Sequence, residues 1–282
     1  MMSQLIDDSD QNDIQDQIAG EIAAATDSPR KRALKKFALA AISVIPWVGP
    51  LIVAGIELAG KGDKVDDLQC QWLESHRVKF QRLHETLRQI AERLASFGEA
   101  VDARLEDPKF LTLVEKSFQS WDRATTDEKR DYIRRLVANA AATSLCDDDL
   151  VRLFLDWIDR YDETHFKVIK AIYKQNGINR RSIWLKMHST IPRDDSSEAD
   201  LFKLLIHDLT LGHVIRQKRQ TTISGKFVKK PKGGRSPVTG TMQTPFDSEK
   251  PYELTQLGVQ FVHYVMDEVA PQIAGFSMGT DL

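Results

Sequence analysis

Two pairs of arginine and histidine residues have a spacing that suggests catalysis. Arg160 and His165 enclose four residues, and Arg77 and His84 enclose six. Histidine transfers protons near neutral pH, and an arginine guanidinium stabilises negative charge that develops during a reaction. These pairs therefore suggest acid–base chemistry, provided that helices bring the two side chains to one place.

The R-x4-H pattern of Arg160 and His165 resembles that of the HEPN family of helical ribonucleases. The resemblance implies that the histidine activates the 2′-hydroxyl of RNA and that the arginine stabilises charge on the phosphorane. Both arginine–histidine pairs depart from the family pattern at the position after the arginine, where a polar residue is usual. Tyr161 follows Arg160, and Val78 follows Arg77. We keep an HEPN-like ribonuclease as the second alternative function and expect no catalytic residue otherwise.

Other catalytic and cofactor motifs are absent from the sequence. There is no Walker loop, no Rossmann glycine fingerprint, no His/Cys cluster with zinc spacing and no Gly-x-Ser-x-Gly elbow. We therefore expect no metal, no cofactor and a non-enzymatic protein.

Basic residues concentrate in the C-terminal part of the chain and could bind phosphates. Residues 209–246 contain eight Lys or Arg and no acid. Phosphate contacts of this kind give a salt-dependent affinity with little sequence preference. The predicted nucleic-acid-binding or partner-binding residues are Arg180, Arg181, Lys186, Arg216, Lys218, Arg219, Lys226, Lys229, Lys230, Lys232 and Arg235.

An apolar run at residues 37–60 carries one charge, Glu57, and is interrupted by Pro46-Trp47-Val48-Gly49-Pro50. A membrane-spanning helix needs about 20 apolar residues, and each arm of this run has only about ten. Basic residues flank both ends, which favours a re-entrant hairpin if the run meets a membrane. The alternative is a hairpin buried in a helical core or in an oligomer interface. The predicted hairpin residues are Phe37, Ile42, Ile45, Trp47, Val48, Leu51, Ile52 and Ile56.

Composition indicates an intracellular protein. The net charge is −2, and the two cysteines, Cys70 and Cys146, have no CxxC context, which suits a reducing compartment. The start of the chain is acidic and lacks the apolar core of a secretory signal. We expect a cytoplasmic location, with membrane association on activation under the hairpin hypothesis.

Helix signals extend through the first 211 residues, and we find no strand pattern before residue 210. Helices are expected over 29–45, 51–59 and 64–97, and again after Asp107-Pro108, Thr125-Thr126 and Asp147. The helix over 64–97 has a coiled-coil-like seam, which predicts a protein partner or a homo-oligomer. Short helices over 163–175, 179–188 and 197–211 precede a strand that begins at His213, and a strand and a helix follow Lys250.

This order of three helices, a hairpin and a closing helix resembles the winged helix-turn-helix family over residues 161–268. The resemblance lies in the segments LLIHDLTLGHVIR and YELTQLGVQFV, and the chain departs from the family in its long basic insert, 220–246, between the wing strands. The third helix of such a domain normally enters the major groove of DNA. Here that helix carries Glu198, Asp200 and Asp208 beside Lys203, so the sequence predicts a poor groove reader.

Residues 37–160 resemble a group of bacterial helical proteins found among phage-resistance genes, the abortive-infection alpha group. The likeness rests on the order of a Pro/Gly-broken apolar hairpin, a heptad helix and the phrase DEKRDYIRRLVANA at Asp127–Ala140. It implies a non-enzymatic defence protein that harms or halts the infected cell and transfers no catalytic residue to this chain.

We therefore predict a mainly α protein with an acidic N-terminus (1–28), an all-helical domain (29–160), a winged-helix domain (161–268) and a tail (269–282). The predicted function is an abortive-infection-type effector or accessory protein. It would act through the hydrophobic hairpin and through a winged-helix module that binds a partner. A DNA-binding regulator is the first alternative.

Overall fold

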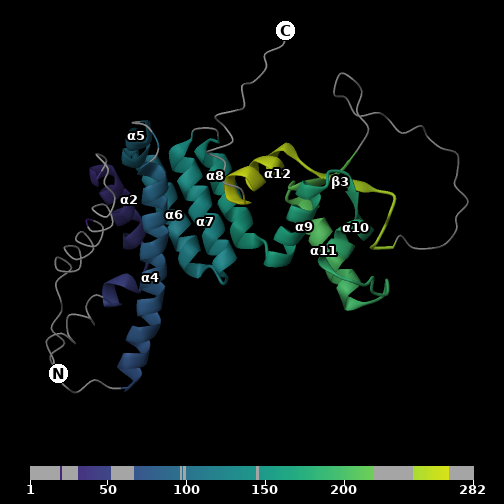
Figure 1. Ribbon diagram of the computed structural model, residues 1–282, viewed down its shortest axis with the longest axis horizontal. Helices are drawn as coiled ribbons and strands as arrows, with labels where there is room; N and C mark the ends of the chain where they lie inside the picture. The colour runs from purple at the N-terminus through teal and green to yellow at the C-terminus, as the bar shows by residue number, and fades with distance from the viewer. Residues whose placement is uncertain are drawn as a thin grey trace, which may run out of the picture. The chain divides into compact units, whose positions relative to one another are not determined.

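The computed structural model describes residues 31–51, 67–95, 97, 100–143, 146–218 and 244–266, together with Gly20. The described part is mainly helical and contains a small three-stranded antiparallel sheet, as the sequence predicts. The chain divides into two units, whose helices and strands are labelled in Figure 1. Unit 1 comprises Met1–Arg160 and Tyr264–Leu282, and unit 2 comprises Tyr161–His263.

Unit 1 is a bundle of helices. Its described helices are α2 (Lys31–Ser43), α4 (Asp67–Ala95), α5 (Ala100–Glu106), α6 (Pro108–Arg123), α7 (Asp127–Ala142) and α8 (Asp148–Arg160). Helix α2 packs on α5 and α6, and α7 packs on α4, α6 and α8. Helix α5 was not anticipated from the sequence, which shows no start signal between Gly98 and Asp107.

Local capping explains where the helices of unit 1 begin. The side chain of Asp107 accepts a hydrogen bond from the backbone N–H of Lys109, and Pro108 occupies the first helical position of α6. Thr126 caps α7 in the same way through the backbone N–H of Lys129. The side chain of Asp147 accepts from the backbone N–H of Leu150 at the start of α8. These starts agree with the sequence prediction.

The apolar seam of the long helix belongs to the core of unit 1. Its central side chains, Leu83, Leu87, Ile90 and Leu94, are buried, and α4 packs on α7. These apolar side chains therefore serve the fold of the unit. The predicted contact of this helix with a partner or a second copy stays a prediction, and it would have to use the exposed side chains of α4.

Unit 2 combines short helices with the sheet. Its elements are α9 (Glu163–Lys174), β1 (Ile178–Asn179), α10 (Arg180–Met187), α11 (Ser197–Leu211), β2 (Ile215–Gln217), β3 (Pro251–Leu254) and α12 (Gln256–Phe261). The π-helical segment η1 (Val262–Met266) follows α12 and crosses into unit 1. The sequence predicts that Tyr264–Met266 belong to the C-terminal domain, whereas the structure groups them with unit 1.

The sheet has the order β1-β3-β2, and both pairings are antiparallel. Ile178 pairs with Tyr252, and Ile215 pairs with Leu254. The prediction of no strand before residue 210 was wrong at β1. This strand has only two residues, so it carries no alternating pattern, and its partner lies more than 70 residues further along the chain. The strand expected to begin at His213 begins at Ile215 and is described over Ile215–Gln217, and residues 219–243 lie outside the described part.

An aromatic cluster holds α10, α11 and the segment before β3 together. The rings of Phe202 and Phe246 stack with centroids 5.6 Å apart, and the ring of Trp184 meets both edge-on. The indole N–H of Trp184 donates to the backbone oxygen of Thr190 at 2.7 Å. The cluster therefore fixes α11 relative to α10, because burial of large aromatic rings dominates the energy of a small core.

Candidate functional site

The first arm of the apolar hairpin is buried in unit 1. Helix α2 packs its apolar face on α6, and the rings of Phe37 and Phe118 meet edge-on with centroids 6.2 Å apart. The hairpin side chains Phe37, Ile42, Ile45 and Val48 are all buried. Leu51 is half-buried, and Ile52 and Ile56 lie outside the described residues. The described arm thus agrees with a hairpin buried in the helical core. Beyond Leu51 the second arm lies outside the described residues, so its placement stays a prediction.

The turn of the hairpin is held by a polar contact. The indole N–H of Trp47 donates to a carboxylate oxygen of Asp122 at 2.6 Å, and the Trp47 ring meets the ring of His76 edge-on. On α2, Lys36 donates to Glu106 at 3.1 Å. Among the described residues, no helix is long and apolar enough to cross a membrane.

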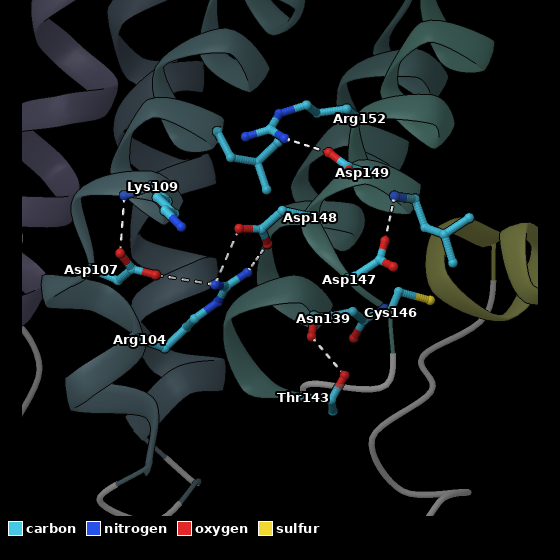
Figure 2. Close-up of polar contacts among 12 residues, drawn as sticks. Arg104, Asp107, Lys109, Asn139, Thr143, Cys146, Asp147, Asp148, Asp149 and Arg152 are labelled. Carbon is cyan, nitrogen blue, oxygen red and sulfur yellow. Dashed lines mark hydrogen bonds and ion pairs between the residues drawn. The ribbon is translucent and has the colours of Figure 1, made fainter.

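A polar hollow of about 620 Å³ lies in unit 1 between the end of α5, the end of α7 and the start of α8 (Figure 2). Its volume falls within the range of small-molecule sites. Lining residues with polar side chains are Arg104, Lys109, Thr143, Cys146, Asp147, Asp148, Asp149 and Arg152. In the sequence, Asp147 marks only the start of a helix, and no pattern indicates this hollow.

Arg104 is the central cation of the hollow. Its guanidinium binds the carboxylate of Asp148 through two nitrogens and lies 3.5 Å from Asp107. The same guanidinium stacks on the ring of Phe110 with its carbon 4.4 Å from the centroid. Asp148 lies in the first turn of α8, where the helix dipole also favours a carboxylate. The pair therefore joins α5 to α8.

Cys146 forms the buried wall of the hollow. Burial raises the pKa of its thiol. Its backbone N–H donates to the hydroxyl of Tyr264 at 3.1 Å, and that hydroxyl also lies 2.7 Å from the hydroxyl of Thr143. Burial raises the pKa of Tyr264 to about 12. A thiol with a raised pKa is a weak nucleophile at neutral pH, so Cys146 is suited to packing rather than to covalent catalysis.

The charges in the hollow largely compensate one another. Arg152 binds Asp149 at 2.8 Å, and Arg104 is shared between Asp107 and Asp148. Within the described part of the chain, no group of three or more His, Cys, Asp or Glu side chains is arranged to hold a metal ion. The hollow can accept a small polar molecule, but its geometry does not select a reaction.

The two residues of the R-x4-H pattern have different surroundings. Arg160 is exposed at the end of α8. His165 is buried in α9, where its Nδ1 accepts the backbone N–H of Asp162 at 3.1 Å and its Nε2 lies 3.7 Å from Asp208. His165 therefore completes the cap of α9. Arg77 is exposed on α4 and His84 is half-buried there. None of these positions tests the ribonuclease hypothesis, which stays a prediction.

The described basic residues of unit 2 lie mainly on α10 and the strands. Arg181, Lys186 and Lys218 are exposed. Arg180 donates to the hydroxyl of Tyr252 at 2.9 Å, and Arg216 on β2 forms an ion pair with Glu253 on β3 at 2.8 Å. The remaining predicted contacts lie outside the described residues: Arg219, Lys226, Lys229, Lys230, Lys232 and Arg235.

Helix α11 presents leucines to solvent, a feature that the sequence analysis did not single out. Leu204 is 52% exposed and Leu211 is 60% exposed, although the other face of the helix buries Phe202, Leu205, Ile206 and Leu209. Leu201 is 51% exposed. The signal was present in the sequence, because EADLFKLLIHDLTL has more apolar residues than one helix face can bury.

Charges of both signs flank the exposed leucines. Asp200 forms an ion pair with Lys203 at 3.0 Å, and His207 is exposed one turn further on. The pKa of Glu198 is lowered by hydrogen bonds from its own backbone and from Ser196 and Ser197. The surface of α11 therefore combines apolar side chains with carboxylates.

Comparison of the chain with protein-family models, curated proteins and solved structures finds no match. The resemblances to the abortive-infection alpha group, the winged helix-turn-helix family and the HEPN family therefore stay predictions.

Proposed function

We propose that the chain is a non-enzymatic protein whose C-terminal unit is a winged helix-turn-helix module that binds another protein through α11. The observation that carries this proposal is the surface of α11, which presents leucines and carboxylates at the position where a DNA-binding member presents groove-reading side chains.

The element order supports the winged-helix assignment. Helix α9, strand β1, helices α10 and α11, and then strands β2 and β3 follow one another along the chain, and the strands pair in the order β1-β3-β2. The first strand thus lies beside the last one, so the three helices and the sheet enclose one core. The segment between β2 and β3 corresponds to the wing.

The chemistry of α11 favours protein over DNA as its ligand. A helix in the major groove needs donors for base edges and cations for the flanking phosphates. Glu198 and Asp200 would instead repel the phosphates, and Leu204 and Leu211 would bring apolar surface toward a polar groove. Exposed apolar side chains of this size on a rigid helix are typical of protein contact sites.

A site-specific photocrosslink tests the protein-binding function in living cells. The full chain is expressed with benzoylphenylalanine at Leu204, and a matched variant carries it at Lys167, which is exposed on α9. We expect a protein adduct from position 204 after irradiation and none from position 167. A nucleic-acid adduct, or no adduct at position 204, would overturn the proposed function.

DNA binding by the basic residues of α10 and the wing is the competing function. A titration of duplex DNA at several salt concentrations tests whether α11 takes part in any such binding. Protein binding through α11 predicts that Leu204→Asp leaves any DNA affinity unchanged. A groove-reading α11 predicts that Glu198→Lys increases it, because the new cation would lie near a phosphate.

A role in phage defence, with action of the hairpin at a membrane, is the cellular setting that we propose for this binding protein. It rests on the resemblance over residues 37–160. Because α2 is packed in unit 1, the hairpin would first have to leave that core. Flotation with anionic liposomes tests this step: wild type should float less than an Asp122→Ala variant, which lacks the contact to Trp47. Equal flotation of the two would count against release of the hairpin.

A further inference from the structure

Two of the exposed leucines of α11, Leu204 and Leu211, form one row, and Leu201 lies beside it. Leu204 and Leu211 are seven residues apart, which is two helical turns, so they lie above one another on the same face. Asp200 and His207 are also seven residues apart and form a second row beside the leucines. Asp208 lies on the other side, 3.7 Å from His165.

This pattern is self-complementary when two copies of α11 pack antiparallel. Leu204 is the midpoint of Ser197–Leu211, so a two-fold axis at Leu204 overlaps the whole helix, about 22 Å at 1.5 Å per residue. In that register Leu204 meets its own counterpart, and Leu211 covers the first turn of the other helix. Antiparallel packing also places each helix dipole against the opposite end of the other.

The flanking polar side chains agree with this register. In an antiparallel pair, side chains on one side of the contact stay on that side after the two-fold rotation. The row of Asp200 and His207 therefore faces the same row of the second copy. Counting from the axis, Asp200 lies four residues before Leu204 and His207 three residues after it, so each His207 approaches the Asp200 of the other copy. Two such pairs form, one on each side of the axis.

We propose that α11 is the contact surface of a homodimer, in which two copies of α11 pack antiparallel with Leu204 on the two-fold axis. This inference rests on the proposed function, because it takes protein to be the ligand of α11, and it names a second copy of this chain as that protein. An isologous contact uses the same patch on both subunits, as this one does.

Analytical ultracentrifugation of the full chain measures the oligomeric state. We expect wild type to sediment as a dimer of twice 32.0 kDa. Leu204→Asp should raise the dissociation constant at least tenfold, because it places two carboxylates at the axis. Leu185→Asp is the matched control, since Leu185 is similarly exposed but lies on α10. A monomeric wild type, or a dimer that tolerates Leu204→Asp, would overturn the inference.

Cysteine crosslinking tests the register itself. In a Cys70→Ser, Cys146→Ala background, Leu204→Cys should form a disulfide between copies on oxidation. Leu211→Cys should not, because the two copies of residue 211 would lie about 21 Å apart along the helix axes. Crosslinking of both positions to the same extent would overturn the register. Circular dichroism of each variant shows whether it is folded.

The charges provide a second, independent test. His207→Glu places a carboxylate near Asp200 of the other copy and should weaken the dimer. His207→Arg should preserve it, and His207→Glu combined with Asp200→Lys should restore it. An unchanged dissociation constant in His207→Glu contradicts the predicted pairing.

The photocrosslink at position 204 separates failure of this inference from failure of the proposed function. An adduct of two copies of the chain supports both. An adduct with a different protein, together with a monomeric wild type, keeps the proposed function and rejects the homodimer. No protein adduct at position 204 rejects both.

Discussion

The indole N–H of Trp47 donates to Asp122 at 2.6 Å and so joins the turn of the apolar hairpin to the last turn of α6. The two residues are 75 positions apart in the chain. Trp47 is half-buried, whereas Val48 beside it is buried completely. The turn that the sequence presents as a membrane-facing tip is thus anchored on the helical core by one charge-assisted hydrogen bond.

Removing that hydrogen bond should loosen the hairpin. Asp122→Ala should lower the free energy of unfolding of unit 1 by about 1.5 kcal/mol, because a hydrogen bond to a charged group is lost. Trp47→Phe should have a similar effect while keeping an aromatic ring beside His76. The measurement is urea denaturation. Asp156→Ala serves as the control, because Asp156 binds Lys116 at the exposed surface and such pairs contribute about 0–1 kcal/mol. Equal losses in Asp122→Ala and Asp156→Ala would contradict the prediction.

The Arg104–Asp148 pair should stabilise unit 1 more than the neighbouring Arg152–Asp149 pair does. Arg104→Ala leaves the half-buried carboxylate of Asp148 without its partner and removes the stacking on Phe110, so we expect a loss of about 2 kcal/mol. Arg104→Lys should recover only part of this, because an ammonium neither binds both oxygens nor stacks in the same way. Thermal or urea denaturation gives both values.

Arg152→Ala is the matched control in the same hollow. The Asp149 side chain that Arg152 binds is 91% exposed, so the loss should stay below about 1 kcal/mol. If the two alanine variants were equally stable, the hollow would not depend on Arg104 in the way that the contacts indicate.

Features with local causes could be predicted from the sequence. Asp107-Pro108 and Thr126 start α6 and α7 because a short polar side chain caps the backbone two or three residues ahead. The mainly helical composition follows from the same signals and from the spacing of apolar residues. The exposure of leucines on α11 could also be predicted, because this helix has more apolar residues than one face can bury.

Features that depend on distant partners could not be predicted. Strand β1 exists because Ile178 pairs with Tyr252, and nothing within its two residues signals a strand. The hollow depends on Arg104 and Asp148, which are 44 positions apart. Likewise, the burial of Phe37 depends on Phe118, so composition alone left both a core hairpin and a membrane hairpin open.

The raised pKa of the Cys146 thiol should make it slow to react. In a Cys70→Ser variant, iodoacetamide should alkylate Cys146 much more slowly at pH 8 than it does in the urea-unfolded chain, because only the thiolate reacts. The rate in the folded state should rise as the pH increases. Mass spectrometry at timed intervals measures it, and equal rates in the folded and unfolded chains would show that the thiol is neither buried nor shifted.

The same shift predicts the direction of a pH effect on stability. Folding favours the protonated thiol, so its contribution is fully present below the pKa of the unfolded thiol, about 8.5, and decreases as the pH rises above it. Cys146→Ala should remove this part of the decrease between pH 8 and 10. A Cys146→Ala curve parallel to that of wild type over this range would contradict the assignment.

Gly212 closes α11 where only a hydrogen atom fits. A Cβ at this position would overlap the hydroxyl of Tyr161, and the next nearest atoms, the ring carbon that bears the hydroxyl and the backbone oxygen of Asp208, would lie 3.2 Å away. Gly212→Ala should therefore destabilise unit 2 by about 1–3 kcal/mol, the usual cost of overpacking.

A double-mutant cycle shows whether the hydroxyl causes this loss. Tyr161→Phe removes the overlapping oxygen, so Gly212→Ala should cost less in the Tyr161→Phe background than in wild type. The backbone at Gly212 has a φ of −72°, which any residue adopts, so strain of the main chain does not contribute. Urea denaturation of the four proteins gives the coupling energy, for which we expect at least about 1 kcal/mol. A coupling energy near zero would mean that the loss comes from the backbone of Asp208 rather than from Tyr161.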